Sequence, residues 1–315
     1  MSNTLVSALQ IDGLVAATAT PMNPDGSINL TMIKPQVDFL VTQGIKGIYI
    51  LGSTGEGFSL TDDERMQVTE TFVTANQGRM KTFVQVGHNS WKASANLAAH
   101  AQTCGVDAIS ATPPGYFKPE SVAGLCDGLE IITSAAPETP FYYYHIPFLS
   151  GVNIDVSQFI RTASERMDSF AGIKYSDGST LYNLQNMQEA GPDKEYLAGS
   201  DEAFLMSIAQ GYKGAVGSTY GYGAPIYNHV RSCFEAGNME EARMWQQRAL
   251  QMIDAIFATC GRAGLKAMWS MVGVDCGPVR TPLSQASPEQ IAALRKQLET
   301  IGFFDWCASQ LKAAV

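Results

Sequence analysis

The chain has 315 residues, of which 45% are hydrophobic and 16% are charged, and its formal net charge is −9. This composition is typical of a globular protein with a sizeable core. The negative charge argues against a nucleic-acid partner or an anionic membrane surface, because both attract basic patches. No run approaches the roughly 18 apolar residues that a membrane-spanning helix needs, and the first residues lack a signal-peptide pattern.

Cysteine and histidine spacing gives no sign of a metal site. The six cysteines are scattered without a Cys-x-x-Cys pair, and none of the four histidines stands at ligand spacing from another. This pattern indicates reduced thiols rather than a disulfide framework or a zinc site. We therefore expect a cytoplasmic protein without a bound metal or cofactor.

Apolar, β-rich runs recur along the first part of the chain and predict a series of strands. The predicted strands are 14–20, 47–51, 82–86, 108–111, 141–144, 172–175, 196–198 and 214–217. Segments of helical character lie between most of them, at 31–43, 62–77, 91–104, 120–134, 156–166, 181–190 and 202–210. After Pro225 the β signal stops, and further helices are predicted at 226–236, 239–259, 265–271 and 288–301, followed by a last short helix.

Strands that alternate with helices predict a parallel sheet with crossover helices, and eight such units close a (β/α)₈ TIM barrel. A doubly wound open sheet is the competing interpretation, but no Gly-x-Gly-x-x-Gly fingerprint follows the first strand. We therefore expect an α/β barrel over residues 1–235 that carries the active site. Residues 236–315 would form a C-terminal helical extension packed on the barrel rather than an independent domain.

The segment Gly52-Ser-Thr-Gly-Glu-Gly57 follows the second predicted strand. Active sites of such barrels lie at the C-terminal ends of the strands. The glycines permit a tight turn whose N–H groups point into one concavity, and Ser53 and Thr54 add hydroxyl donors. A nest of this kind suits a carboxylate. A plain connecting turn is the alternative, and a phosphate site of the Walker type lacks its lysine.

Lys174 interrupts the apolar run from Phe170 to Ser176 close to its downstream end. Most lysines lie on solvated surfaces. In a strand, however, side chains alternate, so that Lys174 points to the barrel axis while Ile173 and Tyr175 meet the helices. Burial disfavours the charged form of a lysine and makes neutral amine available. A neutral amine at an apolar cavity can attack a ketone and form a Schiff base.

The fifth predicted strand ends in three tyrosines and a histidine. A period of two places Tyr142 and Tyr144 on one face and Tyr143 on the other. A tyrosine at the mouth of the strand next to Lys174 could shuttle a proton to or from the substrate, while aromatic packing is the alternative. For His145, which lies just beyond, we expect a structural role.

Acidic and hydroxyl side chains follow the last two predicted strands. Asp201 and Glu202 open a helix, so they either cap it or accept hydrogen bonds from a polyhydroxylated substrate. Ser218 lies in a turn with a second hydroxyl group. Together, an amine, a carboxylate nest, a phenol and paired carboxylates on one rim indicate imine chemistry on a 2-oxo acid.

In these motifs the chain resembles the superfamily of class I aldolases that includes N-acetylneuraminate lyase and dihydrodipicolinate synthase, and it is more similar to the lyases. The resemblance runs from about Val15 to Tyr220, with a trace near Arg280. The motifs are Gly52-Ser-Thr-Gly-Glu56, Tyr144-His-Ile-Pro-Phe-Leu-Ser-Gly-Val152, Gly172-Ile-Lys174, Gly199-Ser-Asp-Glu202 and Gly217-Ser-Thr-Tyr220.

The resemblance implies that Lys174 forms the imine with pyruvate and that Tyr144 moves the proton as the carbon–carbon bond breaks. Ser53 and Thr54 would hold the carboxylate of pyruvate. The residues implied to contact the hydroxylated part of the substrate are Ser176, Gly199, Asp201, Glu202 and Ser218. A homotetramer is also implied, in which Tyr116 matches an aromatic side chain that members can contribute across a subunit interface.

Three positions depart from the pattern of the resemblance. Leu149 stands where the synthases carry an arginine for a second carboxylate. Phe148 replaces a small alanine of the lyases, which could narrow the pocket, and Gly221 stands where bacterial lyases often have asparagine. The last two positions leave the identity of the aldehyde open.

We therefore expect a pyruvate-dependent aldolase that cleaves N-acetylneuraminate to N-acetylmannosamine and pyruvate. An aldolase for a 2-keto-3-deoxy sugar acid or another 4-hydroxy-2-oxo acid is the first alternative, and a 4-hydroxy-tetrahydrodipicolinate synthase is the next. A non-catalytic sensor of 2-oxo acids on the same scaffold is a further alternative, because a fold alone does not determine a function.

Overall fold

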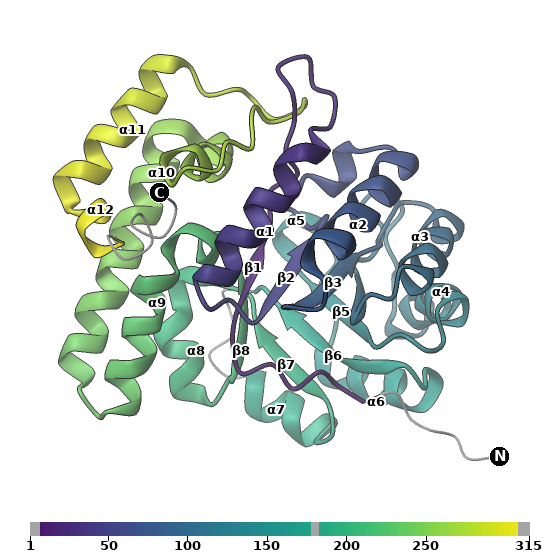
Figure 1. Cartoon of the computed structure of the whole chain (residues 1–315). Helices are drawn as coiled ribbons and strands as arrows, with labels where there is room; N and C mark the ends of the chain where they lie inside the picture. The colour runs from purple at the N-terminus through teal and green to yellow at the C-terminus, as the bar shows by residue number, and fades with distance from the viewer. Residues whose placement is uncertain (1–6, 178–182, 308–315) are drawn as a thin grey trace.

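The computed structural model describes residues 7–177 and 183–307 (Figure 1). Within these residues, eight parallel strands form a closed barrel in which each strand pairs with the next and β8 pairs with β1. The strands are β1 (Gly13–Ala17), β2 (Gly47–Ile50), β3 (Lys81–Gln85), β4 (Ala108–Ala111), β5 (Phe141–His145), β6 (Phe170–Tyr175), β7 (Glu195–Ala198) and β8 (Gly214–Gly217). The predicted (β/α)₈ barrel is confirmed, and a doubly wound open sheet is excluded.

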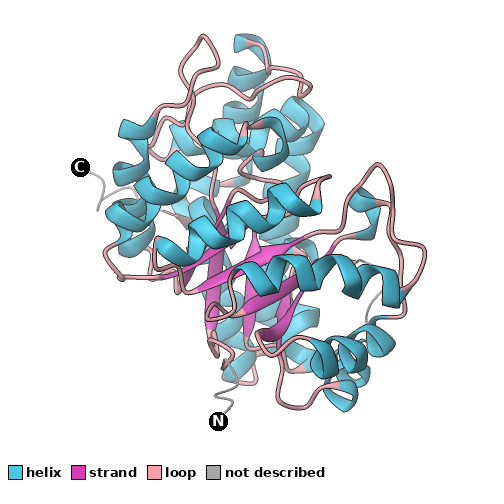
Figure 2. Cartoon of the chain, turned by 90° about the vertical axis from the view of Figure 1, so that its right-hand side faces the viewer, coloured by secondary structure: helices cyan, strands magenta, loops and turns pink. Residues whose placement is uncertain are grey.

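Helices enclose the strands from outside (Figure 2). The barrel helices are α1 (Ile33–Thr42), α2 (Asp62–Asn76), α3 (Trp91–Thr103), α4 (Val122–Ala135), α5 (Pro147–Ser150), α6 (Val156–Arg166), α7 (Asn183–Ala190), α8 (Phe204–Gln210) and α9 (Tyr220–Glu235). Three 3₁₀ turns lie among them, η1 (Leu30–Met32), η2 (Gly57–Ser59) and η3 (Asp201–Ala203). The chain ends in α10 (Met239–Met271), α11 (Pro288–Ile301) and α12 (Phe303–Trp306). Residues 181 and 182, which begin one predicted helix, lie outside the described residues. No helix in the described ranges is long and apolar enough to cross a membrane.

Side-chain alternation along the strands divides the core into two layers. Tyr142 and Tyr144 belong to the cluster inside the barrel, whereas Tyr143, Ile173 and Tyr175 pack in the layer between strands and helices. The predicted alternation in β5 and β6 is therefore confirmed. Further members of the inner cluster are Val15, Ala17, Tyr49, Phe83, Ala108, Leu197 and Val216.

The segment before β1 closes the N-terminal end of the barrel. Ile11 packs into the inner cluster. Its backbone N–H and the hydroxyl of Tyr142 both donate hydrogen bonds to the carboxylate of Glu195. Burial has the largest effect on the pKa of Tyr142 and the Glu195 carboxylate the next largest, and both raise this pKa far above its ordinary value. The hydroxyl therefore stays protonated and remains a donor. Side chains therefore fill the lower part of the barrel.

α9 begins at Tyr220 rather than at residue 226. The glycines and proline of residues 221–225 predict a turn, but they lie inside the helix. A Cβ at Gly221 would lie 2.5 Å from the ring of Trp269 on α10, so the absence of a side chain lets the two helices approach. Tertiary packing thus outweighs the poor helix propensity of glycine here.

α10 contains both helices that were predicted at 239–259 and 265–271. They join at Gly261, whose φ of 56° and ψ of −142° are not helical. Glycine reaches a positive φ without the steric penalty that a Cβ brings, so it suits this break. The break lies where α10 passes the open end of the barrel.

A buried ion pair joins α10 to the loop after β2. The Nζ of Lys266 lies 2.9 Å from Oε1 of Glu56, and their side chains are only 4% and 3% exposed. The second oxygen of Glu56 accepts a hydrogen bond from the backbone N–H of Arg280 at 2.6 Å. Burial lowers the pKa of Lys266 below its usual value, and the adjacent Glu56 opposes this shift.

Arg280 forms a second link between the C-terminal part of the chain and the β2–α2 region. Its Nη1 and Nη2 donate to the two oxygens of Glu64 at 2.6 and 2.8 Å. Glu64 also forms a capping box with Thr61 at the start of α2. The loop that carries Ser53 and Thr54 is thus held on both sides by residues of the C-terminal part.

Replacing Lys266 by methionine should destabilise the protein strongly. The substitution leaves the Glu56 carboxylate buried and without its cation, and breaking a buried pair in this way costs about 3–5 kcal/mol. The free energy of unfolding in urea measures the effect. Lys34→Met is the control, because Lys34 is 71% exposed in its pair with Asp38, and such a pair contributes at most about 1 kcal/mol. Similar losses in the two variants would contradict the prediction.

Candidate active site

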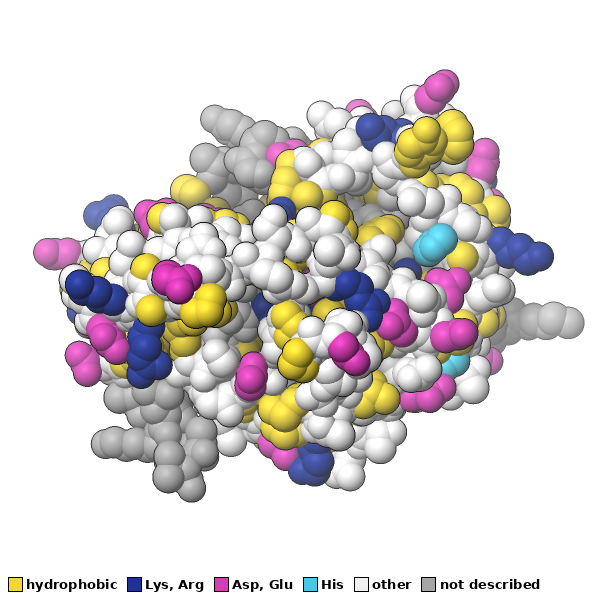
Figure 3. All heavy atoms as spheres, turned by 90° about the horizontal axis from the view of Figure 1, so that it is seen from above, with side chains coloured by type: hydrophobic (Ala, Val, Ile, Leu, Met, Phe, Trp, Pro, Cys, Tyr) yellow, Lys and Arg dark blue, Asp and Glu magenta, His cyan; other side chains and the backbone are white. Residues whose placement is uncertain are grey.

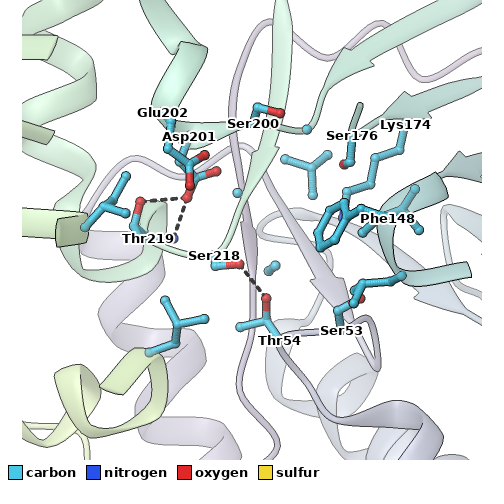
Figure 4. Close-up of a pocket in the computed structure, with 18 of the residues that line it drawn as sticks. Ser53, Thr54, Phe148, Lys174, Ser176, Ser200, Asp201, Glu202, Ser218 and Thr219 are labelled. Atoms are coloured by element: carbon cyan, nitrogen blue, oxygen red, sulfur yellow. Dashed lines mark hydrogen bonds between the residues drawn. The ribbon is translucent and has the colours of Figure 1, made fainter. Parts of the chain in front are cut away.

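A cavity of about 210 Å³ opens at the C-terminal ends of the strands, between the barrel and α10 (Figure 4). All the site residues expected from sequence line it: Ser53, Thr54, Tyr144, Lys174, Ser176, Gly199, Asp201, Glu202 and Ser218. They come from the ends of β2, β5, β6, β7 and β8, which explains how segments distant in sequence meet on one rim.

Lys174 reaches into this cavity from β6. The residue is 4% exposed. Its Nζ lies 3.9 Å from the ring centroid of Tyr144 and 4.0 Å from that of Tyr49. Among the described residues, no carboxylate lies within ion-pair distance of it. An amine that is buried between aromatic faces and points into a cavity is positioned to attack a substrate carbonyl.

Tyr49 is a neighbour of Lys174 that the sequence analysis missed. Its hydroxyl donates to Oγ of Ser110 at 2.9 Å, and Ser110 donates onward to the backbone oxygen of Tyr142 at 2.8 Å. Burial, and then the nearby Tyr144, raise the pKa of Tyr49 well above its ordinary value. Tyr49 therefore stays protonated and orients the pair of rings around Lys174. Its position in the middle of an apolar strand resembles that of an ordinary core residue.

The loop after β2 has a strained backbone that glycines make possible. Leu51 and Glu56 adopt left-handed φ values of 61° and 55°. A Cβ at Gly57 would lie 2.0 Å from the backbone oxygen of Leu51, so no other residue fits. The turn presents Thr54 to β8, where its Oγ1 lies 2.7 Å from Oγ of Ser218. Hydroxyl groups from two strand ends therefore meet at the cavity wall (Figure 4).

The two adjacent acids have different environments. Asp201 is buried and accepts hydrogen bonds from the backbone N–H and Oγ1 of Thr219 at 2.8 and 2.7 Å. Burial, and then repulsion from Glu202, raise its pKa to about 6, although the bonds from Thr219 oppose this shift. Glu202 is exposed. Asp201 therefore has a fixed orientation, whereas Glu202 stands at the mouth.

Ser176 and Gly199 lie against each other beside Lys174. A Cβ at Gly199 would lie 1.9 Å from Oγ of Ser176, so only glycine leaves room for the hydroxyl. The Oγ of Ser176 is buried and has no hydrogen-bond partner among the described residues. A buried hydroxyl in this state is available to a ligand in the cavity.

The three positions that depart from the pattern, together with Tyr116 and His145, have separate locations. Phe148 and Leu149 line the cavity. Gly221 and Tyr116 do not, since Gly221 packs on α10 and Tyr116 lines a neighbouring groove. His145 is buried, stacks on Tyr175 at 4.9 Å between ring centroids, and has a pKa lowered to about 4, chiefly by burial. This environment fits the structural role expected for His145.

α10 supplies lining residues that no sequence signal indicated. Ile253, Phe257, Arg262 and Leu265 face the cavity from the two sides of the break at Gly261. They follow no strand, so the rule that places active sites at strand ends does not find them. Their positions depend on how α10 folds back over the barrel.

A group of metal-ligand side chains lies elsewhere, on the outer helices. Glu70 on α2 and His100 and Cys104 at the end of α3 have ligand atoms within 4.8 Å of one another. Nε2 of His100 and Oε1 of Glu70 are 2.8 Å apart, so a direct hydrogen bond already joins them. None of the three lines the cavity.

Comparison with known proteins identifies the family. The model of the dihydrodipicolinate synthetase family matches residues 10–301. The chain belongs to this family. Within it, N-acetylneuraminate lyase of Gallus gallus is 38% identical over 297 residues, which cover 93% of this chain and 96% of the relative. N-acetylneuraminate lyase B of Xenopus laevis is 41% identical over 260 residues, covering 82% and 97%.

Solved structures show the same family fold. The N-acetylneuraminate lyase of Proteus mirabilis superposes with a TM-score of 0.90 at 32% identity, covering 93% of this chain and 99% of that chain. The lyase of Aliivibrio salmonicida, also called sialic acid aldolase, has the same TM-score and identity, with coverages of 93% and 97%.

The raised pKa of Asp201 makes folding depend on pH. Because the folded state holds this proton more tightly than the unfolded chain does, the stabilisation is fully present below the unfolded pKa of about 4. It is lost as pH rises through about 6. Relative to Asp201→Asn, we expect the wild-type free energy of unfolding to increase by about 1 kcal/mol between about pH 7.5 and about pH 5. Urea unfolding at both pH values measures this difference, and parallel responses would refute it.

Proposed function

We propose that the protein is a pyruvate-dependent class I aldolase that cleaves N-acetylneuraminate to N-acetylmannosamine and pyruvate. The observation that carries this proposal is the buried amine of Lys174, which faces a cavity lined by hydroxyl groups and carboxylates. Relatives of nearly the same length that are named N-acetylneuraminate lyase support the choice of substrate.

The proposed reaction starts with attack of the Lys174 amine on the C2 ketone of the open-chain substrate. Loss of water gives a protonated imine, which withdraws electrons from the C3–C4 bond. Tyr144 accepts the proton of the C4 hydroxyl as that bond breaks, and the aldehyde leaves. The electron pair remains as an enamine, which is protonated at C3. Water then hydrolyses the resulting imine and releases pyruvate.

The remaining residues would hold the substrate. The hydroxyls of Ser53 and Thr54 are suited to the C1 carboxylate, because they lie on the glycine-rich turn beside Lys174. The hydroxylated part would extend past Ser176, Gly199 and Ser218 toward Asp201 and Glu202. Carboxylates accept hydrogen bonds from sugar hydroxyls, and the free Oγ of Ser176 can donate or accept one.

A shorter substrate is the second candidate. Phe148 lines the cavity and is 69% exposed, so its ring stands at the opening and limits the space for a long sugar chain. A 2-keto-3-deoxy sugar acid, whose chain is shorter than that of a nine-carbon acid, would need less of this space. The apolar Leu149 in the cavity wall argues against a synthase, which would bind a second carboxylate beside β5.

Release of pyruvate from N-acetylneuraminate and from 2-keto-3-deoxygluconate distinguishes the candidates. We expect kcat/KM to be at least about tenfold higher for N-acetylneuraminate, because more pocket contacts act in the transition state. The reverse preference would overturn this substrate in favour of the shorter acid.

Two variants separate the roles of Lys174 and Tyr144. With pyruvate and borohydride, wild type should gain a covalent adduct, which Lys174→Met should lose together with turnover. Tyr144→Phe should still form the adduct, while kcat falls by about 10²–10⁴-fold because proton transfer is lost. Lys34→Met is the control and should match wild type in both measurements. A protein that binds pyruvate without any adduct would be a sensor rather than an aldolase.

We also propose that the protein works as a homotetramer. Two large aromatic side chains of the segment between β4 and α4 are exposed, Tyr116 by 79% and Phe117 by 83%, and Tyr116 lines the groove beside the cavity. Figure 3 looks down on the molecule and shows hydrophobic side chains scattered among charged ones. Contact with another chain would cover these aromatic side chains, as large exposed apolar surfaces are covered in assemblies. Sedimentation velocity should give the mass of four chains, and Phe117→Asp should shift it to smaller species. A wild-type monomer at micromolar concentration would rule the assembly out.

A further inference from the structure

Arg262 stands at the junction of two cavities on the C-terminal face of the barrel. It lines the candidate active site together with Lys174, and it also lines the neighbouring groove together with Phe58 and Tyr116. Lys174 and Arg262 are the basic side chains that line the active-site cavity in the described part of the chain. Lys174 is buried, whereas Arg262 is exposed. The two basic residues therefore mark the floor and the mouth of one cavity.

The guanidinium of Arg262 has no hydrogen-bond or ion-pair partner among residues 7–177 and 183–307. Arg280 and Arg166, in contrast, each donate to carboxylates. Glu202 lines the same cavity but is not paired with Arg262. An arginine keeps its charge over the working pH range and presents a fork of N–H donors that matches a carboxylate or phosphate. Within the described residues, these donors are free for a ligand.

The backbone places Arg262 at this position. Arg262 directly follows Gly261, where α10 leaves helical geometry with a φ of 56° and a ψ of −142°. Beyond it, Lys266 anchors the helix to Glu56 through the buried ion pair. The non-helical backbone at Gly261 precedes Arg262, and the Lys266–Glu56 ion pair follows it. Together they fix the start of this helical segment over the cavity. The position of Arg262 therefore follows from the architecture of α10.

The depth of the cavity indicates which end of a substrate Arg262 meets. If Lys174 bonds to C2, as the proposed function requires, the C1 carboxylate lies beside Ser53 and Thr54 near the floor. The rest of the substrate then extends toward the mouth, where Arg262, Phe148 and Phe257 line the wall. The far end of the sugar chain is the part that reaches Arg262.

We propose that Arg262 forms an anion subsite at the mouth of the cavity and binds a phosphate or carboxylate group at the far end of the sugar-acid substrate. This proposal rests on the proposed function and extends it to substrates with a second negative charge. A charge-assisted, bidentate contact is strong when buried, but Arg262 is exposed and screened by salt. We therefore expect a preference of about tenfold rather than a larger one.

Condensation of pyruvate with two matched aldehydes tests the subsite. N-Acetylmannosamine and its 6-phosphate differ only in the phosphate group at the end that would face the mouth. We expect the ratio of kcat/KM, phosphorylated to unmodified, to fall about tenfold in Arg262→Leu. Arg262→Lys should retain part of the preference, because it keeps the charge but not the fork of donors. Arg243→Leu, an exposed arginine on the same helix that lines neither cavity, should leave the ratio unchanged.

An unchanged ratio in Arg262→Leu would overturn the proposal. So would a selective rise in the KM for pyruvate, which would assign Arg262 to the C1 carboxylate instead. Calorimetric titration of the pyruvate-free enzyme with N-acetylmannosamine 6-phosphate measures the subsite without turnover, because the condensation requires pyruvate. Affinity should be about tenfold lower in Arg262→Leu than in wild type, and equal affinities would refute the subsite. If neither aldehyde reacts but this difference remains, the proposed reaction fails while the subsite stands.

Discussion

The buried contact between Glu56 and Lys266 is the interaction on which the candidate site depends. It joins α10 to the strained loop after β2, two parts of the chain that are more than two hundred residues apart. The loop carries Ser53 and Thr54, while α10 carries Arg262 and Leu265. Buried ion pairs add little net stability compared with apolar packing. We therefore infer that this pair matters because it fixes how α10 and the loop after β2 are arranged relative to each other. It sets the position of one cavity wall relative to the other.

Much of the site could be predicted because a parallel barrel brings strand ends together. Lys174 and Tyr144 are neighbours in space because β5 and β6 pair with Tyr144 opposite Lys174. The alternation of apolar and polar positions in β6 was sufficient to point the lysine inward. The turns after β2, β7 and β8 reach the same rim for the same reason. Local patterns therefore determine which residues meet here.

Other features depend on tertiary packing and left no local signal. Tyr49 lies in a uniformly apolar strand, and its contact with Lys174 becomes evident only once the barrel closes. The predicted start of α9 was wrong, because Gly221 allows the close approach of Trp269, a residue on another helix. Asp201 and Glu202 are adjacent in sequence, yet Thr219 orients only the first. The cavity-lining residues of α10 could not be predicted, because no strand precedes this helix and its path over the barrel becomes evident only in the structure.

The sealed lower end of the barrel has a kinetic consequence. Among the described residues, Ile11, Tyr142 and Glu195 block passage through the N-terminal end of the barrel, so the cavity opens toward the C-terminal ends of the strands. A three-carbon fragment attached to Lys174 would lie behind whatever occupies the outer part. The two products of a cleavage must then depart in a fixed sequence, with the sugar aldehyde first and the keto acid last. In the opposite direction, the keto acid must load before the aldehyde can enter.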